Sequence, residues 1–177
     1  MRNRIHMKLF AIAALAVSAL AYPNPGPAAG VRAKLSEQVR HELVMMPYYG
    51  LFDHLSFSVD GEKVILMGEV TRPTLKTEAE RRVKSLTGVE EVDNRIRVLP
   101  LSPHDDRIRL ATMRAIFGNP ALSRYSLGAR PPIHFIVENG KLTLKGKVIN
   151  EMDRNLAGIL ANGVPGAFEV RNELVVN

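Results

Sequence analysis

The side chains that could carry catalysis or bind a metal are scattered along this sequence of 177 residues. The sequence has no cysteine, which excludes a thiol nucleophile, an iron–sulfur cluster and a thiolate zinc site. Its histidines lack the His-x-His and His-x-x-x-His spacings of metal pairs. They are His6, His41, His54, His104 and His134. No nucleophile elbow, phosphate-binding loop or catalytic pair of carboxylates is present either. We therefore expect no enzyme activity, no metal and no cofactor.

Two short motifs resemble ligand sites but have simpler explanations. Asp105 and Asp106 follow Ser102-Pro103, and acidic residues are favoured in the first turn of a helix without any bound cation. Gly163-Val-Pro-Gly166 has the Gly-x-x-Gly spacing of loops that hold a nucleic-acid backbone. A related segment, Ser85-Leu-Thr-Gly88, lacks the first glycine and a flanking basic run. The sequence therefore predicts no nucleic-acid partner.

Contact with a charged surface is the chemistry that the remaining residues favour. Lys145 and Lys147 share one face of a predicted strand, and Arg171 takes the same face of a later strand. Such a cationic face could contact anionic headgroups, at about 1 kcal/mol per residue, or could simply be solvated. Ile65 and Met67 stand at the equivalent places of an earlier strand, which indicates that something covers that face.

The segment Met45-Met-Pro-Tyr-Tyr-Gly-Leu-Phe52 is a second candidate for binding. Tyr48 and Tyr49 could place their apolar rings in a membrane interface while their hydroxyl groups stay wet. Alternatively, Leu51 and Phe52 plug the edge of a core and the tyrosines cap it.

The first 21 residues have the layout of a secretory signal peptide. A basic start with Arg2, Arg4 and Lys8 precedes an apolar run from Leu9 to Val17, and Ala19-Leu-Ala21 fits a cleavage site. The run is too short to span about 30 Å of hydrocarbon comfortably, which favours a cleaved leader over an uncut anchor. We expect cleavage after Ala21 and a periplasmic product. Its net charge falls from +6 to +3 without the leader, so the basic character of the chain comes partly from the leader.

The remainder of the chain contains an internal repeat. Residues 59–98 align without a gap onto residues 137–176 at a constant offset of 78, and 11 of the 40 positions are identical. Agreement in one register over this length indicates a duplication. We accordingly divide the chain into a signal peptide (1–21), a flexible Pro/Gly-rich spacer (22–30), a first domain (31–99), a linker (100–103) and a second domain (104–177).

Each half has the order α-β-β-α-β. Apolar residues every three or four positions predict the helices, and alternation predicts strands joined by tight turns at Asp60-Gly61 and Asn139-Gly140. The first helix of the first half should bury Val31, Leu35, Val39, Leu43 and Met46. The second helix of the second half should bury Met152, Leu156, Ile159 or Leu160, and Val164. The expected fold class is α+β, with two tandem units. In each unit two helices cover one face of a small mixed sheet of three strands.

The repeated residues resemble the BON domain family. The resemblance rests on the phrase Val64-x-Leu-x-Gly-x-Val70, a mid-helix Ala79, and the closing phrase from Gly88 to Val98. The second half departs at Ala167-Phe168, where the first has Val89-Glu90. The resemblance implies a protein of the bacterial envelope. It also implies a role in binding anionic phospholipid surfaces, and in supporting envelope integrity under stress.

We therefore predict an exported, periplasmic, non-enzymatic binding protein whose partner is an anionic phospholipid surface or an envelope protein. The alternative is a protein-interaction or chaperone-like adaptor that acts through Tyr48 and Tyr49 or through the face of Ile65 and Met67.

Overall fold

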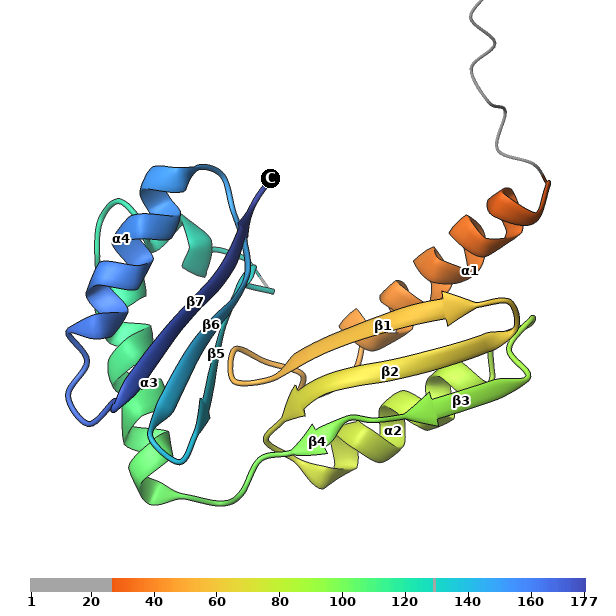
Figure 1. Cartoon of the computed structure of the whole chain (residues 1–177), viewed down its shortest axis with the longest axis horizontal. Coiled ribbons are helices and arrows are strands. Elements are labelled where there is room, and N and C mark those ends of the chain that lie inside the picture. The colour runs from red at the N-terminus through yellow and green to blue at the C-terminus, as the bar shows by residue number, and fades with distance from the viewer. Residues whose placement is uncertain (1–26, 129) are drawn as a thin grey trace, which may run out of the picture.

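The computed structural model describes residues 27–128 and 130–177 and contains two successive α+β units (Figure 1). Unit one consists of α1 (Pro27–Val44), β1 (His54–Asp60), β2 (Lys63–Val70), α2 (Pro73–Lys84), β3 (Glu91–Asn94) and β4 (Arg97–Val98). Unit two consists of α3 (Pro103–Phe117), a short 3-10 turn (Ser123–Ser126), β5 (Ile133–Glu138), β6 (Lys141–Val148), α4 (Glu151–Asn162) and β7 (Glu169–Val176). The predicted order of elements in both halves is confirmed.

The structure describes only part of the two predicted N-terminal segments, the signal peptide and the spacer. The predicted signal peptide, 1–21, and residues 22–26 of the predicted spacer lie outside the described residues. Helix α1 begins at Pro27, so the last four residues of the predicted spacer are helical. Proline is well suited to the first turn of a helix because its missing N–H would have no partner there.

Both sheets have the predicted mixed topology. β1 pairs antiparallel with β2, and β3 and β4 pair parallel with β2; in unit two β5 pairs antiparallel with β6, and β7 pairs parallel with β6. The third strand of unit one is interrupted at Arg95 and Ile96, whereas β7 is continuous. The first hairpin turn is centred on Gly61-Glu62, because Asp60 still pairs with Lys63, so it lies one residue beyond the predicted turn.

Two polar contacts recur in both units and hold the third strand to the second helix. The Asn94 side-chain amide donates to the carbonyl of Lys76 at 3.0 Å, and that of Asn172 donates to the carbonyl of Arg154 at 2.7 Å. Each asparagine oxygen also accepts the backbone N–H of the residue two positions later in the chain. A buried amide needs such partners, and the two sets of contacts keep the offset of 78 found in the sequence.

A glycine with positive φ lies at the same place in each central strand. Gly68 has φ +119° and Gly146 has φ +117°, a conformation that side chains of L-residues rarely adopt. A Cβ on Gly68 would lie 2.0 Å from the carbonyl oxygen of His54, and one on Gly146 would lie 1.9 Å from that of Pro132. The adjacent strand therefore crosses too closely for any side chain.

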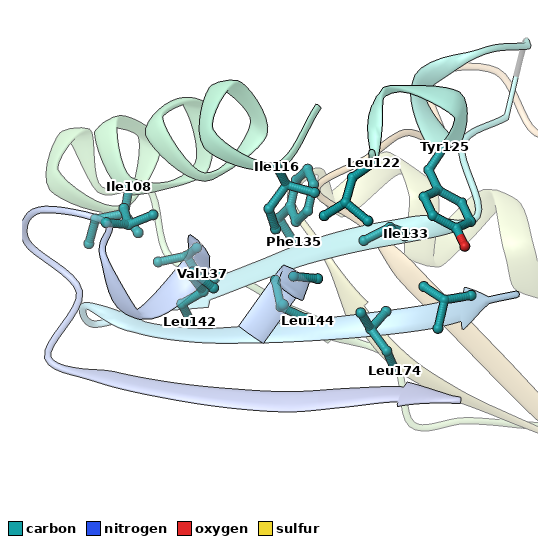
Figure 2. Close-up of a cluster of buried hydrophobic side chains, with 14 residues drawn as sticks. Ile108, Ile116, Leu122, Tyr125, Ile133, Phe135, Val137, Leu142, Leu144 and Leu174 are labelled. Carbon is teal, nitrogen blue, oxygen red and sulfur yellow. The ribbon is translucent and has the colours of Figure 1, made fainter. Parts of the chain in front are cut away.

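Each unit has its own hydrophobic core between its sheet and its two helices. Figure 2 shows the core of unit two, where Phe135 from β5 and Leu144 from β6 meet Ile116 of α3. Tyr125 lies at its edge, with its ring in the core and its hydroxyl group bonded to Asp153 of α4 at 2.5 Å. Unit one is built in the same way around Leu66, which is fully buried.

Two predicted core residues, Val31 and Met152, are exposed instead, and of the alternatives Ile159 and Leu160 only Leu160 packs against the core. Val31 of α1 is 69% exposed, while the other predicted residues of that helix face are buried. Met152 and Ile159 of α4 are 77% and 69% exposed. The buried face of α4 carries Asp153, Ala157, Gly158 and Ala161. A buried acid and small residues thus occupy the fully buried positions of this helix, Leu156 and Leu160 pack partly buried against the core, and Met152 and Ile159 are left on the outside.

Candidate functional site

The loop between α1 and β1 joins the two units. Leu51 and Phe52 pack against the core of unit two rather than that of unit one. The backbone N–H of Phe135 in β5 donates to the carbonyl of Leu51 at 2.8 Å, so the loop pairs with the edge strand of the second sheet. These residues do plug the edge of a core, as one of the sequence interpretations has it, but the core belongs to the neighbouring unit.

We call the contact of the α1–β1 loop and its neighbouring residues with unit two the joint. Ion pairs surround it. Arg97 of β4 binds Glu138 of β5 at 3.0 Å, and Lys145 of β6 binds Glu69 of β2 at 3.1 Å. Arg97 also lies 3.3 Å from Glu69, which links the two pairs. Arg97 and Glu138 are partly exposed, and pairs of this kind stabilise by about 0–1 kcal/mol each. The apolar loop and its backbone hydrogen bond therefore carry most of the attachment, and the ion pairs align it.

Three aromatic rings fill the middle of the joint. The ring centroid of His134 in β5 lies 5.7 Å from that of Tyr49 and 5.7 Å from that of His54. His134 Nδ1–H donates to the carbonyl of Gly50 at 3.2 Å. Burial lowers the pKa of His54 to about 4, with a further contribution from His134, and burial likewise lowers the pKa of His134. Both imidazoles are therefore neutral at pH 7.

The two predicted tyrosines have different surroundings. Tyr49 is half-buried, its hydroxyl oxygen accepts the backbone N–H of Leu55 at 3.3 Å, and burial raises its pKa to about 12. It belongs to the joint. Tyr48 is 75% exposed, and its ring faces the guanidinium group of Arg72 at 4.9 Å. Of this pair only Tyr48 is largely exposed, with its ring against Arg72.

The three predicted cations do not form one free patch. Lys145 is bound to Glu69 and lies 3.9 Å from Glu173, which leaves its side chain 22% exposed. Arg171 is exposed, but it pairs with Glu169 at 2.7 Å. Lys147 is exposed. Their role in lipid contact stays a prediction, and the observed contacts of Lys145 favour a role in joining the units.

Ile65 and Met67 are half-buried on the outer side of β2. They lie opposite Ser58 and Ser56 of β1. Their role as a contact for an envelope protein also stays a prediction.

Sequence reasoning missed a larger surface on the helical side of unit two. Arg107, Leu110 and Arg114 follow one another along the side of α3 that faces away from its buried residues. Met152 and Ile159 take the same outward position on α4, which lies beside α3 over the sheet (Figure 1). We call these five residues the outward face of unit two.

The outward face combines exposed apolar and cationic side chains. Leu110 is 40% exposed, and Met152 and Ile159 are far more exposed than ordinary helix residues of their type. Arg107 and Arg114 are exposed, and neither takes part in an ion pair within the described part of the chain. Apolar side chains flanked by unpaired guanidinium groups suit the boundary between headgroups and acyl chains of an anionic membrane.

Unit one lacks this combination on its equivalent helix. Thr74 and Arg81 of α2 stand where α4 has Met152 and Ile159. The fold therefore does not require large apolar residues at these places, because the same fold exists with a polar side chain and a charged one. Exposed apolar residues at these two helix positions occur in unit two alone.

The sequence model of the BON domain matches residues 32–100 and 105–177. The chain belongs to the BON domain family. BON domains are known as phospholipid-binding modules of the cell envelope and are in general not catalytic, and here two of them stand in tandem. No curated protein matches the chain.

Solved structures similar to this BON pair include two of CdsD, a structural protein of the type III secretion system of Chlamydia trachomatis. One, of its C-terminal domain, is 18% identical with a TM-score of 0.31, and the match covers 80% of this chain and 64% of that chain. The other is 16% identical with a TM-score of 0.29, and the match covers 81% of this chain and 92% of that chain. This likeness carries no functional argument.

The described part of the BON pair contains neither a membrane-spanning helix nor a cluster of metal ligands. No helix there has both the length and the hydropathy needed to cross a bilayer. Within the same residues, no three His, Asp or Glu side chains gather closely enough to hold a metal ion.

Proposed function

We propose that this BON pair is an exported, periplasmic, non-enzymatic envelope protein that binds anionic phospholipid surfaces through the outward face of unit two and so supports envelope integrity. The observation that carries the proposal is the combination of Leu110, Met152 and Ile159, all exposed, with Arg107 and Arg114, both without an ionic partner. The signal-peptide layout of residues 1–21 supports export, and the family supports phospholipid as the ligand.

The geometry supplies two attractive contributions on the same face. Insertion of the apolar side chains removes them from water at about 25 cal/mol per Å² of apolar area. Each guanidinium group held near anionic headgroups adds about 1 kcal/mol. Because the two contributions are modest, we expect reversible binding that weakens as salt screens the charges.

Reversing the two charges of the outward face tests the proposal. Arg107→Glu with Arg114→Glu should weaken binding to vesicles of phosphatidylglycerol and phosphatidylcholine by at least about 30-fold, because two attractions of about 1 kcal/mol are lost and repulsion is added. Vesicle co-sedimentation at low and high salt measures this change. Lys147→Glu, on the outer side of the sheet, is the matched control and should bind like the unmodified chain.

The proposal is contradicted if the chain binds vesicles of phosphatidylcholine alone as tightly as vesicles that also contain phosphatidylglycerol. So does a larger loss from Lys147→Glu than from the arginine pair, since that result assigns the contact to the sheet. Suppression of a client protein's aggregation in the absence of lipid, without vesicle binding, would instead favour the chaperone-like alternative.

A further inference from the structure

The joint between the units contains two neutral histidines in a place that cannot easily accept charge. His54 and His134 belong to different units, and their rings meet edge to face at an interplanar angle of 83°. His54 Nδ1 is buried and has no hydrogen-bond partner among the described residues. An unpaired buried nitrogen tolerates the neutral form of the ring far better than the charged one.

Glu69 and Asp53, the two carboxylates beside the rings, favour the charged imidazoles, but each of them already has other partners. His54 faces Lys145 of β6 and Glu69 of β2, and His134 faces Asp53 of the loop, with the ring of Tyr49 beside it at an interplanar angle of 41°. Glu69 is bound by Lys145 and Arg97. The Asp53 carboxylate accepts hydrogen bonds from the backbone and hydroxyl of Thr71 and from the backbone of Gly50. Both carboxylates are therefore already engaged. Arg97, Glu138 and Glu173 complete the charged rim.

We propose that mild acid opens the joint between the two units, because protonation of His54 and His134 places two positive charges against each other and beside Lys145. Opening separates Leu51 and Phe52 from the core of unit two and uncovers Ile136 of β5, which is 5% exposed in the closed form. Acid would thus convert a rigid pair of units into a mobile pair with new apolar surface. This inference does not depend on lipid binding.

The direction follows from proton linkage. An imidazole free of the joint has a pKa near 6.5, whereas that of His54 in the closed joint is about 4. The open form therefore takes up protons between about pH 6.5 and pH 4 that the closed form refuses, and closure weakens as pH falls through that range. For His54 alone, the ratio of open to closed form rises about 30-fold between pH 7.5 and pH 5. His134 shifts the ratio further in the same direction.

Distance measurements between the units test the proposal. The chain has no cysteine, so Thr77→Cys on α2 and Asn155→Cys on α4 place one nitroxide label on each unit. Pulsed electron paramagnetic resonance should give a narrow distance distribution at pH 7.5 and a second, broad population at pH 5. The Cε1–H signals of His54 and His134 in NMR spectra should report proton uptake over the same pH range.

A variant that lacks both imidazoles distinguishes opening caused by protonation of the histidines from opening caused by protonation of carboxylates. His54→Phe with His134→Asn keeps the bulk of one ring and the donor of the other, and it should stay closed at pH 5. His41→Gln, an exposed position on α1, should open like the unmodified chain.

The proposal is overturned by an unchanged distance distribution between pH 7.5 and pH 5, or by opening while both histidines are still neutral. It is also overturned if the double variant is closed at pH 7.5 and opens at pH 5 as the unmodified chain does. If the double variant is already open at pH 7.5, the unmodified chain decides. The proposal holds if the pH midpoint of histidine protonation in NMR agrees with the pH midpoint of opening in the distance measurement, and it is overturned if the two midpoints differ.

Discussion

Alanine in place of Gly68 is expected to destabilise unit one by about 3–5 kcal/mol, an exceptional value for removing no contact at all. The added Cβ would lie 2.0 Å from the carbonyl oxygen of His54, and the positive φ of the residue adds strain. β1 would have to move away from β2, which breaks ladder hydrogen bonds on both sides of Gly68. Urea unfolding followed by far-UV circular dichroism measures the change.

Gly88→Ala separates the clash from the strain. Gly88 also has a positive φ, of +91°, but a Cβ there would meet nothing within 4 Å. This control should therefore lose only about 1 kcal/mol. Equal losses in the two variants would show that β1 does not cross Gly68 as closely as described.

Removal of the apolar part of the outward face is expected to have the largest effect on lipid binding. Met152→Gln with Ile159→Gln should weaken binding to phosphatidylglycerol vesicles by about 100-fold, because insertion of two large apolar side chains contributes about 2–3 kcal/mol. Glutamine forms helices well, so α4 should keep its stability. Vesicle co-sedimentation gives the affinity, and thermal unfolding confirms that the fold is intact.

The equivalent helix of unit one provides the control for this pair. Thr74→Gln with Thr77→Gln changes two exposed positions of α2 and should leave the affinity unchanged. If these threonines matter as much as Met152 and Ile159, the contact does not distinguish the two units, and the outward face of unit two loses its special role.

The repeat made most of the fold predictable. A single register over 40 positions defines the hairpin, the second helix and the third strand twice. The glycines of the central strands and the asparagines of the third strands recur because the close backbone approach and the attachment of the second helix recur. The units themselves could thus be derived from local patterns, since each pattern is satisfied within one unit.

The buried face of α4 could not be derived from hydrophobicity. Asp153 points toward the core, where it accepts hydrogen bonds from Tyr125 and Arg124. Apolar periodicity placed Met152 inward together with Leu156 and Leu160, whereas only the two leucines pack against the core and Met152 is exposed. The alignment did hold a usable signal, because Asp153 stands where unit one has the buried Leu75.

The joint could not be predicted from the sequence for a different reason. His54, His134 and Lys145 meet only because the loop of unit one pairs with β5 of unit two. No pattern along the chain specifies how two units turn toward each other. Lys145 therefore looked like a free surface cation in the sequence, although in the structure it pairs with Glu69.

If the helical side of unit two meets the membrane, a label at the centre of α4 should leave water when the protein binds vesicles. Asn155→Cys lies between Met152 and Ile159 on α4, and a polarity-sensitive fluorophore attached there should shift to the blue and resist an aqueous quencher when phosphatidylglycerol vesicles are added. The same label at Thr77→Cys, its equivalent in unit one, or at Lys147→Cys on the sheet of unit two, should stay in water. A label at position 155 that stays wet while one at 77 or 147 becomes shielded would contradict the account.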